Sequence, residues 1–441
     1  KPGSEMSHST DTTVYVPMVA DYIHHGHINI INTAKEYGSV TIGLMTDSAA
    51  ASYKRLPILS YDERKFILES IEGVKNVVPQ NQLDYVPAIE KYQPKYFVHG
   101  TDWKSGVQKS ARERVFEAMK KINGKVIEPE YTTGISSSEI VNSITSAGIS
   151  PDRRLRQLKR LLDAKPYLRG IEAHSGLTGL IAETASFEND SQIRKFDFLW
   201  LSSLTDSTAK GKPDIELVDV TSRLQTIQDI LEVTTLPIIY DADTGGKIEH
   251  FPYLVSSLCR LGVSACVIED KKGLKRNSLF GTDVNQIQED PNEFAQKIVS
   301  GKKASFNKNF MVIARIESLI LEAGVEDALN RASIYVDAGA DGIMIHSRDK
   351  DIEEIKSFCL RYNEFESRPP LILVPSSYNK YYEDELYKIG ANIIIYANQL
   401  LRSAYPAMLN CANTILSNQR SYEADATMMS IKDILNLIPG T

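Results

Sequence analysis

The chain has 441 residues, of which 42% are hydrophobic and 24% charged, and its formal net charge at pH 7 is −7. This composition excludes a disordered chain, and the length suits a globular protein with two domains. The acidic balance argues against a nucleic-acid binder, which needs a basic face, although it leaves local anion sites open.

Two further features of composition limit where such a protein works. No apolar run approaches the roughly 18 residues that a membrane-spanning helix needs. The four cysteines are widely spaced and form no CxxC pair, which argues against a disulfide framework or a structural zinc site. We therefore expect a cytoplasmic protein that binds neither nucleic acid nor a membrane.

Apolar runs alternate with amphipathic segments along the first third of the chain. The candidate strands are residues 13–20, 40–46, 74–79, 95–100 and 125–130. Alternation of strands and helices, with strands that are apolar throughout, predicts a parallel sheet covered on both faces. We expect a Rossmann-like α/β domain over residues 12–145.

Polar motifs follow three of these strands. The first strand leads into His24-His25-Gly26-His27, an HxGH motif at the start of a helix, where free N–H groups suit a phosphate chain. "GTDW" (100–103) follows the fourth strand, and "TGISSSEI" (133–140) follows the fifth and puts three hydroxyls at a helix start. Lys54 is a further cation within the same domain.

Together these motifs resemble the HxGH cytidylyltransferases. The resemblance implies attack of a phosphate or phosphonate oxygen on the α-phosphorus of CTP. It implies a nucleotide site made of His24, His27, Lys54, Asp102, Trp103, Ser136, Ser137 and Ser138. Adenylyltransferases share HxGH, but the "HGTDW" and "GISSS" context favours cytidylyl transfer.

A boundary near residues 145–155, marked by Gly148 and Pro151, separates this domain from a longer alternation. Its eight candidate strands are residues 167–173, 196–203, 236–243, 265–270, 310–317, 342–347, 370–377 and 392–397. Eight strands with helices between them predict a (β/α)8 barrel, which we place at residues 155–435; an open doubly wound sheet is the alternative.

Six of the eight predicted barrel strands end in polar residues: Ser202-Ser203, Asp241 with Asp243, Glu269-Asp270, Arg315 with Glu317, His346-Ser347 and Ser376-Ser377. The carboxyl ends of barrel strands meet at one face, so these side chains predict a common mouth. Asp241, Asp243 and Glu269 are hard oxygen ligands that favour Mg²⁺. Arg315 is a permanent cation for phosphate or carboxylate.

The stretches "WLSSLTDS", "YDADTGG", "IEDKKGLKRNS" and "ILVPSSY" resemble phosphoenolpyruvate mutases of the isocitrate lyase superfamily. Their signature EDKxxxKxNS is present as Glu269, Asp270, Lys271, Lys275, Asn277 and Ser278. The family interconverts phosphoenolpyruvate and phosphonopyruvate with Mg²⁺. The resemblance implies that Asp241 binds the metal directly and that Asp214, Asp243 and Glu269 act through waters.

The same resemblance assigns the substrate contacts. It implies a phosphoryl site of Lys275, Asn277, Arg315 and His346, and a carboxylate site near Trp200, Ser202, Ser203 and Leu204. Ser203 stands where these mutases carry Gly. A carbon–carbon lyase of the superfamily needs a cysteine in a KKCGH loop, and this chain has "KKGLK" there. Phosphonopyruvate hydrolysis is the closer alternative.

The pairing of the two domains resembles bifunctional enzymes of phosphonate biosynthesis. It implies small-molecule substrates (phosphoenolpyruvate or phosphonopyruvate, CTP and a phosphonate) and a homo-oligomer, a dimer or tetramer with exchanged barrel helices. The acceptor of the CMP group is 2-hydroxyethylphosphonate or 2-aminoethylphosphonate. The alternative of a different class is that one domain is a non-catalytic scaffold for oligomerisation.

Overall fold

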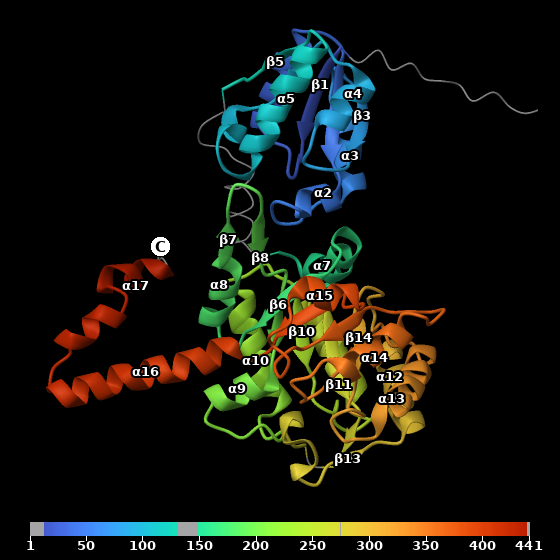
Figure 1. Ribbon diagram of the computed structural model, residues 1–441, viewed down its shortest axis with the longest axis vertical. Helices are drawn as coiled ribbons and strands as arrows, with labels where there is room; N and C mark the ends of the chain where they lie inside the picture. The colour runs from blue at the N-terminus through green and yellow to red at the C-terminus, as the bar shows by residue number, and fades with distance from the viewer. Residues whose placement is uncertain (1–12, 131–148, 274, 439–441) are drawn as a thin grey trace, which may run out of the picture.

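The computed structural model describes residues 13–130, 149–273 and 275–438 (Figure 1). They form a five-stranded parallel sheet followed by a closed barrel of eight parallel strands. The predicted fold class, a Rossmann-like domain followed by a (β/α)8 barrel, is confirmed. The predicted site residues Ser136, Ser137 and Ser138 lie outside the described residues.

All five strands predicted for the N-terminal sheet are present. They are β1 (Val14–Met18), β2 (Val40–Met45), β3 (Val74–Gln80), β4 (Tyr96–Val98) and β5 (Lys125–Ile127). Their order is β3-β2-β1-β4-β5, so the direction of winding reverses between β1 and β4. In such sheets ligands bind at the carboxyl ends of the strands beside the reversal. The HxGH and "HGTDW" motifs follow these two strands, so both lie at that point.

The helices of this domain connect the strands in the expected rhythm. They are α1 (His25–Lys35), α2 (Asp47–Ala51), α3 (Tyr61–Glu69), α4 (Val86–Tyr92) and α5 (Lys109–Lys121), with the short 3-10 turns η1 (Thr101–Lys104) and η2 (Gly106–Gln108). Ser60 caps α3, and α5 buries Ala111, Val115 and Met119 against the sheet. Local capping and one apolar face therefore account for these helices.

The barrel contains all eight predicted strands and closes where the last strand pairs with the first. The strands are β6 (Leu168–Glu172), β9 (Phe198–Leu201), β10 (Ile238–Asp241), β11 (Ala265–Glu269), β14 (Met311–Ile316), β15 (Gly342–Ile345), β16 (Leu371–Leu373) and β17 (Ile393–Tyr396). Phe198, Trp200, Ile239, Val267 and Met344 fill its interior. The interior is therefore a packed core, and ligands have access only at its ends.

Helices cover the outside of the barrel. They are α8 (Gly176–Thr184), α9 (Ser203–Ala209), α10 (Val220–Leu231), α11 (Phe251–Leu261), α12 (Pro291–Ala304), α13 (Gly324–Asp337), α14 (Glu353–Tyr362) and α15 (Glu383–Lys388). Two hairpins that the sequence analysis did not predict are β7 (Ser186–Glu188) with β8 (Ile193–Lys195) and β12 (Lys271–Lys272) with β13 (Ile287–Gln288). They are too short and polar to give a strand pattern.

The helix α7 (Pro151–Ala164) joins the two domains. Its apolar face, Leu155, Leu158 and Leu161, is buried, and Leu158 and Leu161 belong to the cluster that also contains Leu56 of the N-terminal domain. On its polar face, Arg160 donates to the Ile58 carbonyl at 2.9 Å and pairs with Asp47 at 3.3 Å. The N-terminal domain thus packs on the end of the barrel where the strands begin.

The chain ends in an arm that leaves the barrel. The helix α16 (Gln399–Asn418) has no buried residue and extends away from the barrel, followed by η4 (Tyr422–Thr427) and α17 (Ile431–Leu437) (Figure 1). Leu409 and Leu416, seven residues apart on α16, are both exposed. None of the helices in the described parts of the chain is both long and apolar enough to cross a membrane.

Candidate active sites

The polar strand ends of the barrel meet around one cavity of about 60 Å³. Ser202 follows β9, Asp241 ends β10, Arg315 lies near the end of β14, and His346 follows β15. The cavity is lined by Trp200, Ser202, Ser203, Leu204, Asp214, Asp241, Lys275, Asn277, Arg315 and His346, among others. Barrel closure therefore brings together most of the residues that the sequence analysis assigned to the mutase site.

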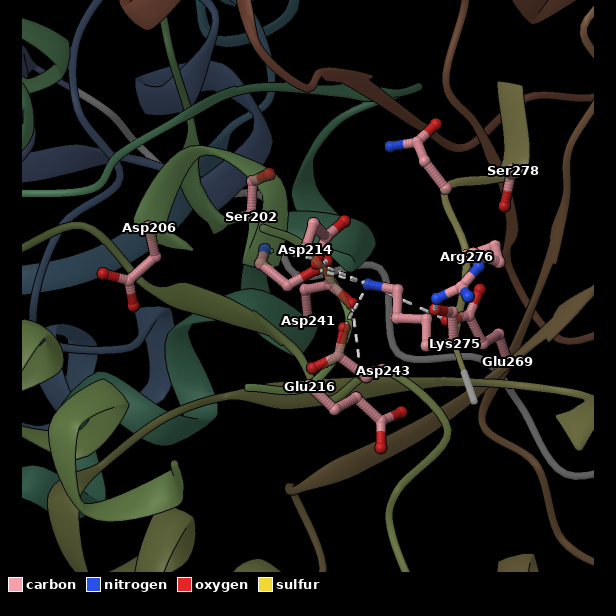
Figure 2. A network of polar contacts seen from close by, with 12 residues as sticks. Ser202, Asp206, Asp214, Glu216, Asp241, Asp243, Glu269, Lys275, Arg276 and Ser278 are labelled. Atoms are coloured by element: carbon pink, nitrogen blue, oxygen red, sulfur yellow. Dashed lines mark hydrogen bonds and ion pairs between the residues drawn. The ribbon is translucent and has the colours of Figure 1, made fainter. Parts of the chain in front are cut away.

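Lys275 reaches from the loop after β11 into the middle of the carboxylates (Figure 2). Its Nζ lies 2.9 Å from Asp214, also pairs with Asp243, and donates to the Ser203 hydroxyl at 2.7 Å. Glu269 lies 3.9 Å away. Burial lowers the pKa of Lys275, but the Asp243 and Glu269 carboxylates outweigh burial and raise it well above its usual value. The lysine is therefore a buried ammonium ion.

The pKa values of Asp241 and Glu269 are shifted in opposite directions although both residues are buried. Burial opposes ionisation of Asp241, but Lys275 and Arg223 outweigh it and lower its pKa to about 2. Asp241 Oδ2 also accepts hydrogen bonds from the Ser203 amide at 2.9 Å and hydroxyl at 2.8 Å. Burial raises the pKa of Glu269 to about 7, and neither of its carboxylate oxygens has a hydrogen-bond partner among the residues that the structure describes. Glu269 therefore retains the capacity to bind another group.

The carboxylates suit a hard divalent cation. Asp214, Asp241 and Asp243 provide oxygen ligands. In the described part of the chain, Glu269 has two buried oxygens without a hydrogen bond and no cysteine lines the cavity, so the donor set fits Mg²⁺. Among the described residues, no group of three or more acidic, histidine or cysteine side chains is already arranged as a metal site. The Lys275 ammonium lies between these carboxylates instead.

The loop that carries the EDKxxxKxNS signature, called the signature loop below, is held at the barrel mouth by hydrogen bonds of Ser278. Its hydroxyl donates to Glu317 at 2.9 Å and accepts from Arg315. Arg315 also pairs with Glu317 at 2.5 Å and with Glu269 at 3.4 Å. Asn277 lines the cavity, and its side chain accepts from the Leu279 amide at 2.9 Å. These bonds hold the loop over the strand ends.

His346 faces the same cavity in its neutral form. Burial and the neighbouring Arg315 lower its pKa to about 3. Its Nδ1 is buried and has no hydrogen-bond partner among the described residues. A buried ring nitrogen without a partner is costly unless a ligand engages it. His346 is therefore suited to contact a bound substrate.

Two buried arginines, Arg223 and Arg331, carried no signal in the sequence. Arg223 of α10 donates to the Leu201 carbonyl at 3.0 Å and to the Asp241 carbonyl, so it braces two strand ends. Asp270 of the signature accepts from Tyr335 at 2.7 Å and pairs with Arg331 at 3.3 Å, away from the mouth. Both arginines belong to helices with ordinary amphipathic patterns, and only their tertiary contacts identify them.

A second cavity, of about 180 Å³, lies at the carboxyl ends of β1 and β4. His24, His27, Lys54, Asp102 and Gln108 contribute to its wall. His24 is the N-terminal cap of α1, and the two imidazole centroids are 4.2 Å apart. The tertiary structure thus brings Lys54 and Asp102 to the HxGH motif.

The backbone determines which nitrogen of each histidine carries the proton. His24 Nδ1 accepts from the Gly26 amide at 3.0 Å, and His27 Nδ1 accepts from the His24 amide at 3.2 Å. Burial lowers the pKa of His27 to about 3 and also lowers the pKa of His24. In the neutral rings the proton is therefore on Nε2, so each imidazole is a hydrogen-bond donor there.

Trp103 lies beneath this pocket rather than in its wall. It is fully buried, its ring stacks on His99 at 4.0 Å between centroids, and its Nε1 donates to Glu128 at 2.8 Å. Asp21, which the sequence analysis did not select, accepts from the Ile58 and Leu59 amides at 2.9 and 3.1 Å. Through these hydrogen bonds, Asp21 connects the loop before the HxGH motif to the segment after Lys54.

Comparisons with known proteins agree with this geometry. A family model described as phosphoenolpyruvate phosphomutase matches residues 158–416, and one described as cytidylyltransferase-like matches residues 19–143. The phosphoenolpyruvate phosphomutase of Tetrahymena pyriformis is 32% identical over 68% of this chain and 95% of its own length. The phosphonopyruvate hydrolase of Variovorax sp. (strain Pal2) is 33% identical over 64% of this chain and 93% of its own length.

A crystal structure titled as a phosphonopyruvate hydrolase complex with oxalate and Mg²⁺ is also similar. It has a TM-score of 0.57 and 30% sequence identity, and the match covers 66% of this chain and 95% of that chain. The resemblance stated for each domain is therefore confirmed. Because the first family model covers more than half of the sequence, the chain belongs to the phosphoenolpyruvate phosphomutase family and carries an N-terminal cytidylyltransferase-like domain.

Proposed function

We propose that the chain is a bifunctional enzyme of phosphonate biosynthesis. Residues 155–435 interconvert phosphoenolpyruvate and phosphonopyruvate, and residues 12–145 transfer CMP from CTP to a small phosphonate. The observation that supports the first activity best is the barrel mouth, where four carboxylates lie beside Arg315, His346 and the signature loop. Such a site holds a divalent cation on one side and a phosphoryl group on the other.

The proposed mutase step moves a phosphoryl group between carbon and oxygen. The C–P bond of phosphonopyruvate breaks, and the phosphoryl group bonds to the enolate oxygen of the pyruvate unit. Arg315, His346 and Asn277 would hold the phosphoryl oxygens, because a loose, metaphosphate-like transfer needs mainly cations and fixed donors around them. The turn at Ser202, Ser203 and Leu204, above Trp200, would hold the carboxylate.

Mg²⁺ is the proposed cofactor, bound directly by Asp241 and through waters by Asp214, Asp243 and Glu269. When bound, it supplies a concentrated positive charge for the substrate oxygens. The Lys275 side chain would then move away from the carboxylates and contact the phosphoryl group. The Ser203 hydroxyl, which bridges Asp241 and Lys275, occupies a position where the resembling mutases carry no side chain.

The second candidate for the barrel is phosphonopyruvate hydrolysis, since a hydrolase is as similar to this chain as a mutase is. The two activities differ in whether water reaches the phosphoryl group. The Lys275-x-Asn277 spacing and a loop fastened at Ser278 favour exclusion of water. The test is ³¹P NMR with phosphonopyruvate and Mg²⁺: phosphoenolpyruvate supports the mutase, whereas inorganic phosphate with pyruvate supports the hydrolase.

We predict that Asn277→Ala lowers mutase turnover by about a hundredfold while Mg²⁺ affinity changes little. The amide would contact only the phosphoryl group, and loss of one such donor typically costs about this much. A partly open loop also admits water, so the remaining products should shift toward pyruvate and inorganic phosphate. A product-resolved assay measures both effects, and isothermal titration measures Mg²⁺.

A matched variant separates this role from the capping of η3 (Ser278–Asp283). Asn277→Asp keeps the oxygen that accepts from the Leu279 amide but loses the NH₂ donor. It should remain as inactive as Asn277→Ala. Near-normal turnover of either variant would show that Asn277 lies outside the phosphoryl site.

The proposed second activity is nucleotidyl transfer. A phosphonate oxygen would attack the α-phosphorus of CTP, the bond to the β-phosphate oxygen would break, and pyrophosphate would leave. The His24 and His27 Nε2 donors, Lys54 and the hydroxyls of Ser136, Ser137 and Ser138 would stabilise the charge on the phosphates. Asp102 would contact the substrates at the pocket wall. Trp103 would support the pocket indirectly, because its ring stacks on His99, which lines the wall. Incubation of CTP with 2-hydroxyethylphosphonate or 2-aminoethylphosphonate, followed by ³¹P NMR, tests this activity.

We also propose a cytoplasmic homo-oligomer, a dimer or tetramer, in which α16 packs on the barrel of another copy. The exposed Leu409 and Leu416 support this, because a projecting helix with such side chains is poorly solvated alone. Leu409→Asp together with Leu416→Asp should shift the molecular mass measured by light scattering toward the monomer. An unchanged mass would contradict the helix exchange, and Lys120→Glu, at an exposed position of α5, serves as control. The proposal includes no nucleic-acid and no membrane partner, and neither domain is a non-catalytic scaffold.

A further inference from the structure

A third cavity, of about 490 Å³, lies between the two domains. The N-terminal domain contributes Asp21, Lys54 and Arg55 to its wall. The barrel contributes residues that precede its strands: Lys165 before β6, Asp197 before β9 and Thr235 to Pro237 before β10, together with Ile193 and Lys195 of β8. The cavity therefore lies at the end of the barrel opposite the mutase mouth.

This interdomain cavity adjoins the nucleotide pocket. Val19, Asp21 and Lys54 line both. Lys54, proposed above as a catalytic cation, therefore has the HxGH motif on one side and the barrel domain on the other. A molecule in the interdomain cavity would therefore lie beside a nucleotide bound at the HxGH motif.

The two walls of the cavity are joined by direct contacts. Arg55 of the N-terminal domain donates to the Glu183 carbonyl at 2.9 Å and to the Phe196 carbonyl. The hairpin β7–β8 reaches from the barrel toward the N-terminal domain, and Glu188 at its tip lies beside Gly106 (Figure 1). These contacts position barrel side chains next to the nucleotide pocket.

The acidic side chains of the cavity already have partners. Asp197 pairs with Lys165 at 2.7 Å and accepts from the Arg169 amide at 2.9 Å. Glu183 accepts from the Thr234 and Thr235 hydroxyls at 2.7 and 3.2 Å. Asp21 accepts from two backbone amides, as described above. The charge of Asp197 is thus paired with Lys165, whereas the oxygens of Glu183 and Asp21 are engaged by neutral hydrogen-bond donors.

Among the described residues, three cationic side chains of the wall have no ion pair: Arg55, which donates to backbone carbonyls, and Lys54 and Lys195. Lys195 faces the cavity because side chains alternate along a strand: Ile193 and Lys195 line the cavity, whereas Arg194 lies over the Phe187 ring at 4.6 Å. A lysine-lined cavity whose carboxylates are all engaged is suited to an anion.

We infer that the interdomain cavity binds the acceptor of the nucleotidyl transfer and that Lys195 of the barrel domain contacts it. This inference rests on the proposed function. Lys54 would hold the phosphonate group whose oxygen attacks the α-phosphorus of CTP as pyrophosphate leaves. Lys195 would face the other end of the acceptor. That end is neutral or anionic, such as a hydroxyl or carboxylate, because an ammonium group would meet the like charge of Lys195.

The test compares Lys195→Ala with Arg194→Ala, the neighbouring cation on the other face of β8. With 2-hydroxyethylphosphonate as the probe, Lys195→Ala should raise the KM of the phosphonate about tenfold, the size of one lost charged hydrogen bond. The KM of CTP should not change, and Arg194→Ala should leave both constants unchanged. Mutase turnover in the same preparations reports whether each variant is folded.

A charge reversal tests the selectivity. The wild-type protein should prefer 2-hydroxyethylphosphonate over 2-aminoethylphosphonate in kcat/KM, and Lys195→Glu should lower this ratio at least tenfold, whereas Arg194→Glu should not. If the wild type transfers CMP and the Lys195 variants keep the same phosphonate KM and the same preference, the inference is overturned. A rise in the CTP KM instead of the phosphonate KM overturns it too. Failure of the wild type with every phosphonate would refute the proposed nucleotidyl transfer itself.

Discussion

Asp241→Ala is expected to lower phosphonopyruvate turnover by at least about a thousandfold and to leave CTP-dependent pyrophosphate release unchanged. Asp241 is the proposed direct metal ligand, and the Ser203 amide and hydroxyl hold its carboxylate at 2.9 and 2.8 Å. Lys275 and Arg223, which outweigh burial, lower its pKa to about 2, so the wild-type group is charged throughout the physiological range. Removing it takes away a metal ligand and leaves these cations without one of their counter-charges.

The nucleotidyl activity is the internal control for this variant, because the two proposed sites lie at opposite ends of the barrel. Parallel assays of both activities and a thermal melt are the measurements. Asp241→Asn, which keeps the shape and loses the charge, should be nearly as inactive as Asp241→Ala. A folded variant that loses both activities equally would show that the two domains share one site.

His27→Ala is expected to cost about 2–4 kcal/mol of transition-state stabilisation in nucleotidyl transfer, the range for one positioned donor, or roughly 30- to 1,000-fold in rate. Burial keeps the imidazole neutral, with a pKa lowered to about 3, and its Nδ1 accepts from the His24 amide. Nε2 is therefore the donor that would stabilise the phosphates. His24→Ala should have an effect in the same range.

His27→Gln serves as the conservative variant, since its side-chain NH₂ donates from nearly the same distance. It should recover part of the activity that His27→Ala loses, and a merely structural role would give no such recovery. Mutase turnover should be unchanged in all three variants. Pyrophosphate release at the wild-type rate in both alanine variants would refute the assignment of the HxGH motif to phosphate stabilisation.

Local patterns in the sequence were enough to predict the strands and much of both sites. Period and apolar content are properties of a few consecutive residues, so the thirteen strands of the N-terminal sheet and the barrel could be predicted before their pairing was known. The ends of barrel strands share one face, so Asp241, Arg315 and His346 could be assigned to one mouth from their positions alone. In the same way, HxGH and "HGTDW" could be placed together once their strands were paired.

What the tertiary structure decided depends on residues far apart in the chain. Arg223 and Asp21 act through backbone groups of other segments, and neither belongs to a motif. Whether Lys275 lies among the carboxylates or in solvent depends on how the loop packs, and Trp103 proved buried because His99 and Glu128 engage its ring.

The sequence by itself determined two α/β folds and the polar residues at their strand ends, because both follow from short-range patterns, and its motifs indicated the family. Only the tertiary structure decided that the N-terminal domain packs on the strand-start end of the barrel and that α16 leaves it. In the tertiary structure the short hairpin β7–β8 also brings Lys195 to the cavity that Lys54 lines, although the two residues are about 140 positions apart in sequence. Such contacts depend on packing between domains, which leaves no periodic trace in the chain.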